Sequence, residues 1–274
     1  MNETITSGFI TIAGKPNVGK STFLNYVLGE KISITTSKPQ TTRDRIAGIW
    51  NTDKAQIIFL DTPGLHASDK ALNRYMIEKA VTTMSDADIV MVMVEPNDTQ
   101  ESLSKLVPYL DTSHNDKILV LNKIDMMPEE QVNNKIEELA RVYDFRLACG
   151  ISSVNGEGIE SLMDALIQML PEGPRYFPED MITDMSVRFL SKELIREKVF
   201  ALTRKEIPYA SAVEIEEFRE GEPTYIRAVI HVERSSQKGI VIGSGGSMLK
   251  TIGKEARLDI QRLTGTRVNV LNFI

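Results

Sequence analysis

The stretch Gly14-Lys15-Pro16-Asn17-Val18-Gly19-Lys20-Ser21 decides the fold of this chain. It fits G-x-x-x-x-G-K-[ST], a glycine-rich loop whose main-chain N–H groups surround the phosphates of a nucleotide. An apolar run at residues 9–13 precedes the loop, and a helical pattern at residues 22–28 follows it. Because the motif requires strand, loop and helix in this order, a chance glycine turn is the weaker interpretation. The stretch predicts a nucleoside triphosphate site at a strand–helix junction.

Two side chains of this loop have predicted chemical roles. The ammonium group of Lys20 would reach the β- and γ-phosphates, and the hydroxyl group of Ser21 would ligate Mg²⁺. The pattern alone predicts a triphosphate and a magnesium ion, and it leaves the base undetermined.

The composition predicts two globular domains. The chain has 274 residues, of which 42% are hydrophobic and 26% charged, which excludes wholesale disorder. The longest apolar run, residues 89–94, has the length of a buried strand and is too short to span a membrane. No signal peptide is visible at the N-terminus. The single cysteine, Cys149, excludes an internal disulfide and suits a reducing cytoplasm.

Charge is distributed unevenly along the chain. The net charge is −6, but residues 234–274 contain seven basic and two acidic side chains. This basic end predicts contact with a polyanion, and a solvated helix face is an equally good interpretation of the charge alone.

Hydrophobic periodicity predicts an alternation of strands and helices in the first part of the chain. The order favours a mixed, mostly parallel sheet with helices on both faces. Residues 30–43 lack a sustained period and are expected to form a loop. The expected strands are 45–51, 55–61, 88–94, 117–121 and 145–151, and the expected helices are 68–85, 99–112, 129–142 and 157–169.

A second phosphate motif, Asp61-Thr62-Pro63-Gly64, follows the expected strand 55–61. An aspartate at the carboxyl end of this strand lies beside the phosphate loop, where it can hold Mg²⁺ through a water molecule. Gly64 would let a main-chain N–H approach the γ-phosphate. The tetrapeptide alone is weak evidence for a phosphate site, since the Pro-Gly pair also marks an ordinary turn.

The segment Asn122-Lys123-Ile124-Asp125 predicts the base. The carboxylate of Asp125 can accept hydrogen bonds from N1–H and N2–H₂ of guanine, whereas adenine would leave it unpaired. Asn122 would tie this segment to the phosphate loop, and the stem of Lys123 would cover one face of the base. Ser152 and Ser153 should present main chain to guanine O6, although a helix-capping serine pair is the better interpretation of these two residues taken alone.

Three prolines between residues 171 and 180 predict a linker. A helix at 184–203 and strands at 207–218 and 223–233 are expected after it. The turn Gly243-Ser244-Gly245-Gly246 then precedes an expected helix 247–264 and strand 268–274. This order is typical of a KH module, which grips the phosphates of about four single-stranded nucleotides.

These motifs together resemble the Era family of bacterial GTPases over nearly the whole chain, including Pro39-Gln40-Thr41-Thr42-Arg43 and Glu255-Ala256-Arg257. The resemblance implies a P-loop GTPase domain (1–172), a linker (173–184) and a smaller α+β type II KH domain (185–274). It also implies a cytoplasmic GTPase that binds the 3′ region of 16S rRNA and the 30S precursor particle, assists 30S assembly, and can associate peripherally with the inner membrane. The implied ligands are GTP or GDP, Mg²⁺ and K⁺.

Site residues follow from the resemblance. Thr42 would close over Mg²⁺ and the γ-phosphate, alongside Ser21 and, through water, Asp61. Leu65 stands where Ras-like proteins place a water-orienting glutamine, and a leucine cannot orient water. Asn17 would then help to hold K⁺, which predicts slow, K⁺-stimulated hydrolysis. The expected catalytic set is Lys20, Thr42, Gly64 and Asn17, and the expected nucleotide contacts are Gly14, Lys15, Pro16, Asn17, Val18, Gly19, Lys20, Ser21, Thr22, Asp61, Thr62, Pro63, Gly64, Leu65, Asn122, Lys123, Asp125, Ser152 and Ser153.

RNA contacts are expected on both sides of the glycine-rich turn, with Ile240 and Ile242 as the floor of the groove. Ser153 and Gly245 depart from the family pattern, which usually has alanine and a polar or basic residue there. Only main-chain contacts are expected from Ser153, and Gly245 is expected to weaken phosphate gripping. Relatives usually continue with a short tail beyond Ile274, which would add RNA affinity. The full RNA-binding set is Lys238, Ile240, Ile242, Gly243, Ser244, Gly245, Gly246, Lys250, Lys254 and Arg257.

Two other functions fit parts of the sequence. One is a related GTPase acting in tRNA modification or membrane transport, for which no additional modification domain or membrane span is visible. The other is a KH scaffold that holds GTP or GDP with negligible turnover.

Overall fold

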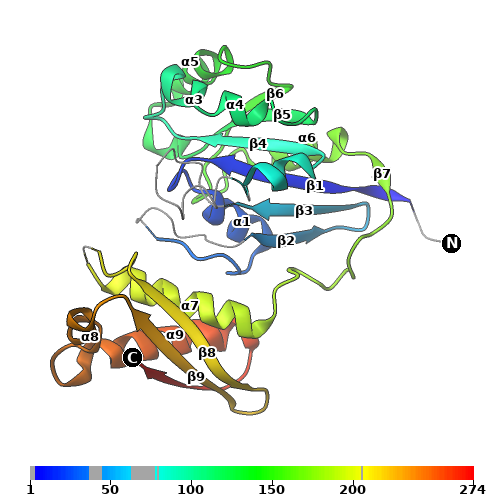
Figure 1. The fold of residues 1–274 in the computed structure, drawn as a ribbon. Helices are drawn as coiled ribbons and strands as arrows, with labels where there is room; N and C mark the ends of the chain where they lie inside the picture. Colours follow the sequence, from blue (N-terminus) through cyan, green and yellow to red (C-terminus); the bar gives the residue numbers. More distant parts are fainter. Residues whose placement is uncertain (1–3, 37–44, 63–77, 79, 205) are drawn as a thin grey trace. The chain divides into compact units, whose positions relative to one another are not determined.

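The structure, a computed structural model, describes residues 4–36, 45–62, 78, 80–204 and 206–274 (Figure 1). These residues form two compact units. The first contains residues 4–33, 45–62, 78 and 80–184, and the second contains residues 34–36, 185–204 and 206–274. The predicted linker, 173–184, groups with the first unit.

The described strands of the first unit form one seven-stranded sheet, in the order β2-β3-β1-β4-β5-β6, with β7 paired to β1. Strands β1, β3, β4, β5 and β6 are parallel, whereas β2 runs antiparallel to β3 and β7 antiparallel to β1. The mixed, mostly parallel sheet is therefore confirmed. The strands are β1 (Ile5–Gly14), β2 (Ile46–Asn51), β3 (Ala55–Asp61), β4 (Ile89–Val94), β5 (Asp116–Leu121), β6 (Leu147–Gly150) and β7 (Glu172–Gly173).

Helices cover both faces of this sheet. Helix α1 (Lys20–Leu28) packs its Phe23 ring edge-on against Phe59 of β3, with 5.5 Å between ring centroids. Neighbouring side chains of β3 point to the opposite face, because successive residues of a strand alternate. On that face of the sheet, side chains of β4 and β5 pack in one apolar cluster with α3 (Gln100–Ser104), α4 (Val107–Leu110) and α5 (Glu129–Ala140). Helix α6 (Ile159–Met169) completes the unit.

The expected helix at 99–112 is divided into α3 and α4. Pro108 lies in the first turn of α4 and has no N–H to donate to the preceding turn, so a continuous helix is interrupted before it. Most of the expected helix 68–85 lies outside the described residues. In β6, burial raises the pKa of the Cys149 thiol to about 11, so the thiol stays protonated at neutral pH.

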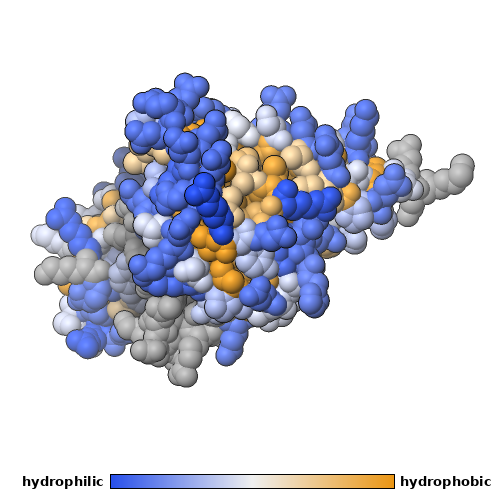
Figure 2. All heavy atoms as spheres, turned by 90° about the horizontal axis from the view of Figure 1, so that it is seen from above, coloured by the Kyte–Doolittle hydropathy of each residue, from blue (hydrophilic) through white to orange (hydrophobic). Residues whose placement is uncertain are grey.

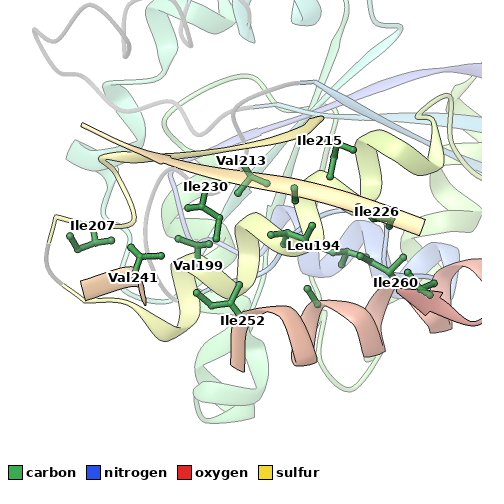
Figure 3. Close-up of a cluster of buried hydrophobic side chains, with 14 residues drawn as sticks. Leu194, Val199, Ile207, Val213, Ile215, Ile226, Ile230, Val241, Ile252 and Ile260 are labelled. Carbon is green, nitrogen blue, oxygen red and sulfur yellow. The ribbon is translucent and has the colours of Figure 1, made fainter. Parts of the chain in front are cut away.

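The second unit is an α+β structure with a three-stranded sheet in the order β10-β9-β8. Strands β8 (Ser211–Arg219) and β9 (Thr224–Val232) are antiparallel, and β10 (Val268–Phe273) runs parallel to β9. Helices α7 (Val187–Leu202), α8 (Ser235–Ile242) and α9 (Ser247–Thr264) accompany the sheet. In Figure 3, Leu194 and Val199 of α7 point into one apolar core with Ile230 of the sheet and Ile252 of α9.

The proline-rich segment, residues 171–184, is attached along the first unit, and we call it the strap. Its residues 172–173 form β7 against β1. Farther along, the main-chain N–H of Ile49 donates to Ile182 O (2.9 Å), and the hydroxyl of Thr183 donates to Ala47 O (2.7 Å). These contacts cover the outer edge of β2, which would otherwise expose unpaired main-chain groups. The expected linker is thus held to the first unit by hydrogen bonds.

Hydrophilic side chains predominate on the face that Figure 2 shows, and apolar atoms gather mainly in its central part. Across the described residues, no helix combines the length and the apolar character needed to cross a bilayer.

Candidate functional site

The phosphate loop connects the end of β1 to the start of α1, as the sequence predicts. Gly19 has a φ of 104°, and a Cβ atom there would lie 2.1 Å from Nδ2 of Asn122. Gly14 has a φ of 150°, and its Cβ would lie 2.4 Å from the carbonyl oxygen of Met93. Both positions require glycine, because the backbone is left-handed and the space is filled. Asn17 is exposed at a φ of 66°, a conformation that asparagine tolerates better than most residues.

Lys20 is buried at the N-terminus of α1, with 6% of its surface exposed. Its Nζ donates to the carbonyl oxygens of Lys15 (2.9 Å) and Gly14 (3.2 Å). Burial lowers the pKa of Lys20 to about 8, although the Asp61 carboxylate opposes the shift. A polyphosphate beside this ammonium would favour its charged form. The loop is thus arranged to take up an anion.

The first and second phosphate motifs meet at Ser21 and Asp61. The Ser21 hydroxyl donates to Oδ2 of Asp61 at 2.8 Å. Both are hard oxygen ligands, which suit Mg²⁺, a metal that takes few protein ligands besides substrate phosphates. The donor set fits a magnesium ion shared with a nucleotide.

Several predicted residues of the phosphate site lie outside the described residues, namely Thr42, Pro63, Gly64 and Leu65. Their roles stay predictions. Thr62 is described and buried, and its hydroxyl donates to the carbonyl oxygen of Ile12 at 2.9 Å. It therefore ties the second motif to β1, beside the phosphate loop.

The N-K-I-D segment follows β5 and joins the phosphate loop through Asn122. Nδ2 of Asn122 donates to Val18 O (2.8 Å), and Oδ1 accepts from the Ser153 main-chain N–H (3.0 Å) and hydroxyl (2.9 Å). The expected main-chain contact of Ser153 with guanine stays a prediction, and the structure adds a role for the Ser153 side chain within the protein. Its hydroxyl adds a buried hydrogen bond that an alanine could not make.

Asp125 is exposed at the end of this segment, and one of its oxygens is already oriented. The Ser152 hydroxyl donates to Oδ1 of Asp125 at 2.5 Å. Lys123, at a φ of 64°, forms an ion pair with Glu95. The carboxylate and the lysine stem thus stand on one loop, as recognition of a guanine base requires.

Two acidic residues in the loop after β4, Glu95 and Asp98, belong to no sequence motif and yet contact the nucleotide motifs. Nζ of Lys15 donates to Oδ1 of Asp98 at 2.5 Å, and Glu95 pairs with Lys123, so this loop contacts both nucleotide motifs. Burial by itself would raise the pKa of Asp98, because it disfavours the ionised carboxylate. Hydrogen bonds from Lys15, the Glu95 N–H and the Ser102 hydroxyl have the larger combined effect, so the pKa of Asp98 is lowered. A signal was available, since polar residues directly after a buried parallel strand lie at the edge where ligands bind.

A second candidate site lies in the second unit, where the glycine-rich turn joins α8 to α9. Gly243 has a φ of 73°, and a Cβ there would approach the Met248 Cβ to 2.7 Å. Gly245 and Gly246 also have left-handed φ values, of 57° and 80°, with open space around them. The turn therefore exposes main chain next to the N-terminus of α9, an arrangement suited to binding phosphate.

A hollow of about 710 Å³ opens beside this turn, between α9 and β10. The predicted residues Gly246, Lys250, Lys254 and Arg257 line it, together with residues that the sequence analysis missed: Tyr225, Leu249, Gly253, Asn269, Val270 and Leu271. The other predicted RNA contacts, Lys238, Ile240, Ile242, Gly243, Ser244 and Gly245, do not line this hollow.

Ile240 and Ile242, the expected groove floor, lie outside this hollow, and their contact with RNA stays a prediction. They belong to helix α8, where residues two apart point in different directions. Ile240 is 51% exposed, whereas Val241 between them is buried in the core. The apolar floor of the hollow comes from Leu249, Val270 and Leu271 instead.

Two protein families match this chain. The 50S ribosome-binding GTPase family matches residues 9–123, and the KH domain family matches residues 206–273. The GTPase Era of Syntrophus aciditrophicus is 49% identical over 273 residues, which cover 98% of this chain and 89% of that protein. The GTPase Era of Geobacter metallireducens is 46% identical over 272 residues, with 98% and 91% covered.

Two solved structures are similar at a TM-score of 0.94 and 37% identity, each covering 98% of this chain and 93% of the other. One is Era in complex with MgGDPNP and nucleotides 1506–1542 of 16S ribosomal RNA. The other is an Aquifex aeolicus Era variant bound to GDP and AlF4⁻. With relatives this similar over nearly the whole length, the chain is a member of the Era family of GTPases, enzymes that hydrolyse GTP.

Proposed function

We propose that this GTPase binds the 3′ region of 16S rRNA in the hollow of its second unit and assists assembly of the 30S subunit. The hollow carries the proposal, because three cations, Lys250, Lys254 and Arg257, line it beside an apolar floor. Cations suit a phosphate backbone, and Tyr225 and Leu249 offer surfaces on which unpaired bases can stack or pack. The relative solved with 16S rRNA supports this choice of RNA. A cytoplasmic location with peripheral contact to the inner membrane belongs to the same proposal and rests on the family resemblance.

At the nucleotide site, the chain's own residues bind and orient the triphosphate. The phosphate loop supplies main-chain N–H groups, Lys20 supplies a positive charge, and Asp125 selects guanine. Ser21 and Asp61 would hold Mg²⁺, which when bound neutralises charge on the β- and γ-phosphate oxygens. Positioning and charge stabilisation then account for catalysis, since Leu65 offers no group that could orient the attacking water. This favours slow intrinsic hydrolysis.

Potassium is expected to stimulate hydrolysis through Asn17. In wild type, turnover in K⁺ buffer should exceed turnover in Na⁺ buffer about tenfold or more, because a cation near the developing charge stabilises the transition state. Asn17→Ala should lower the K⁺ rate to the Na⁺ rate. Single-turnover GTP hydrolysis in matched buffers measures this. Asn134→Ala, an exposed asparagine of α5, is the control and should keep the stimulation. Equal rates in both buffers for wild type would contradict the K⁺ assignment.

The RNA proposal is tested with an oligonucleotide of the 3′ end of 16S rRNA. Lys250→Ala/Lys254→Ala should weaken binding about tenfold or more and reduce the salt dependence by about one unit of slope per lost phosphate contact. Hydrolysis without RNA should stay unchanged, whereas stimulation by RNA should be lost. Fluorescence anisotropy over a salt series measures binding. Lys105→Ala is the matched control, since Lys105 is an exposed lysine of the first unit.

Each alternative function has its own outcome in this experiment. Wild type that neither binds the RNA nor responds to it would point to another RNA, such as a tRNA. Wild type that binds RNA but shows no turnover with any K⁺ or RNA condition would favour a static scaffold.

A further inference from the structure

A closed set of hydrogen bonds connects α1 to the Asp61 carboxylate by two routes. The direct route is the Ser21 hydroxyl, 2.8 Å from Oδ2 of Asp61. The second route passes through the loop after α1, where the Ser33 hydroxyl donates to the same oxygen at 2.9 Å. Asn25, one helical turn after Ser21 on the same face of α1, holds that loop. Neither Ser33 nor Asn25 belongs to a recognised nucleotide motif.

The side-chain amide of Asn25 makes three hydrogen bonds to the main chain of Ile32 and Ser33. Its Oδ1 accepts from the N–H groups of Ile32 (3.1 Å) and Ser33 (2.9 Å), and its Nδ2 donates to the carbonyl oxygen of Ser33 (2.7 Å). These three bonds use only the main chain of the loop. The hydroxyl of Ser33 is therefore left for Asp61, and removing it leaves the attachment of the loop to α1 intact.

The meeting point of the two routes is closed to solvent. Asp61 is 0% exposed and Ser33 is 1% exposed. A buried carboxylate depends on protein donors for stabilisation, because water cannot replace them. Two hydroxyl groups that donate to one carboxylate oxygen fix the rotation of the carboxylate. A carboxylate held in this way can present a defined oxygen toward a metal or its water shell.

We propose that Ser33, held by Asn25, is a positioning residue that orients Asp61 for the Mg²⁺ of the nucleotide complex. The inference rests on the proposed role of Ser21 and Asp61 in holding that ion. Partners that orient metal-binding carboxylates typically change metal affinity about 10- to 100-fold when removed. Asp61 keeps its bond from Ser21, so we expect an effect at or below the lower end of that range.

The test measures release of a fluorescent GDP analogue (mant-GDP) as a function of free Mg²⁺. Ser33→Ala should raise the Mg²⁺ concentration that half-maximally slows release by about three- to tenfold. Its release rate in excess EDTA should stay within about twofold of wild type, because nucleotide contacts that do not involve the metal are retained. Ser7→Ala is the matched control. Ser7 is an equally buried serine whose hydroxyl donates to the Pro174 carbonyl, away from Asp61.

A second pair of variants shows whether Ser33 acts through Asp61. In an Asp61→Asn background, the additional Ser33→Ala change should leave the Mg²⁺ midpoint unchanged. An unchanged midpoint for Ser33→Ala in the wild-type background would overturn the proposal. So would an equal acceleration with and without Mg²⁺, since Ser33 would then act on the nucleotide or the fold. If wild-type release itself ignores Mg²⁺, the proposed magnesium site fails first, and the two failures are thereby distinguished.

Discussion

Asp125→Asn is expected to lower GTP affinity about 10²- to 10⁴-fold and to create a preference for xanthosine triphosphate. A carboxylate accepts two charge-assisted hydrogen bonds from guanine, each contributing about 1.5–3 kcal/mol. An asparagine offers one acceptor and an NH₂ group that opposes the guanine N2–H₂. Xanthine has an oxygen at that position, so the NH₂ group gains a partner. Because Ser152 already donates to Oδ1 of Asp125, the geometry of the side chain is set before the base arrives.

Competition between mant-GDP and unlabelled GTP, XTP and ATP measures this change in preference. Asp144→Asn serves as the control, since Asp144 is an exposed aspartate after α5, and its affinities should match wild type. Loss of GTP affinity without any gain for XTP would show that Asp125 supports the loop and does not read the base.

Gln56→Ala is expected to destabilise the first unit by about 2–3 kcal/mol. Gln56 is fully buried in β3, where its Oε1 accepts from the N–H groups of Tyr176 (2.7 Å) and Phe177 (3.0 Å). Its Nε2 donates to Phe177 O (2.8 Å) and Asn51 Oδ1 (2.7 Å). Truncation leaves several partly buried polar groups without a partner, and each costs about 1 kcal/mol or more.

Urea denaturation measures the loss of stability, and hydrogen exchange at the amides of Tyr176 and Phe177 locates it. Exchange there should accelerate more than exchange in β4, because these amides lose their acceptor directly. Gln100→Ala removes an exposed glutamine that makes a single hydrogen bond to Glu138 O, and should change stability by less than about 0.5 kcal/mol. If both amides of the Gln56→Ala variant exchange at the same rate as in wild type, the other contacts of the strap are sufficient to hold it.

This prediction also changes the interpretation of the proline-rich segment. Its prolines exclude a helix or a central strand and predict a linker between the domains. The hydrogen bonds of Gln56 and those along the edge of β2 hold the strap to the first unit as far as Thr183. The prolines are compatible with this, since a proline has no N–H that would need an acceptor, and the carbonyls of Pro171 and Pro174 accept from the N–H and the hydroxyl of Ser7.

The sequence by itself determined the features whose chemistry is local. The phosphate loop and the N-K-I-D segment are runs of adjacent residues at strand ends, so spacing alone predicts what they present to a nucleotide. Strands β3 and β4 were predicted to within one residue because residues 57–60 and 89–94 are unbroken apolar runs. Pro108 is also a sequence signal for the break between α3 and α4, since a proline favours the first turn of a new helix over the interior of a longer one.

Only the tertiary structure decided the hydrogen bonds that hold these motifs in place. Ser33 is 28 residues from Asp61, Asp98 is 83 residues from Lys15, and Gln56 is 120 residues from Tyr176. None of the three residues carries a sequence signal that names its partner, although the place of Asp98 after β4 marks the edge where ligands bind. The partner of each residue is set by the strand order, which places β1 between β3 and β4. Asp61, Asp98 and Gln56 are buried, so each depends on its protein partner more than on water. Both the strand order and the burial are properties of the packed chain.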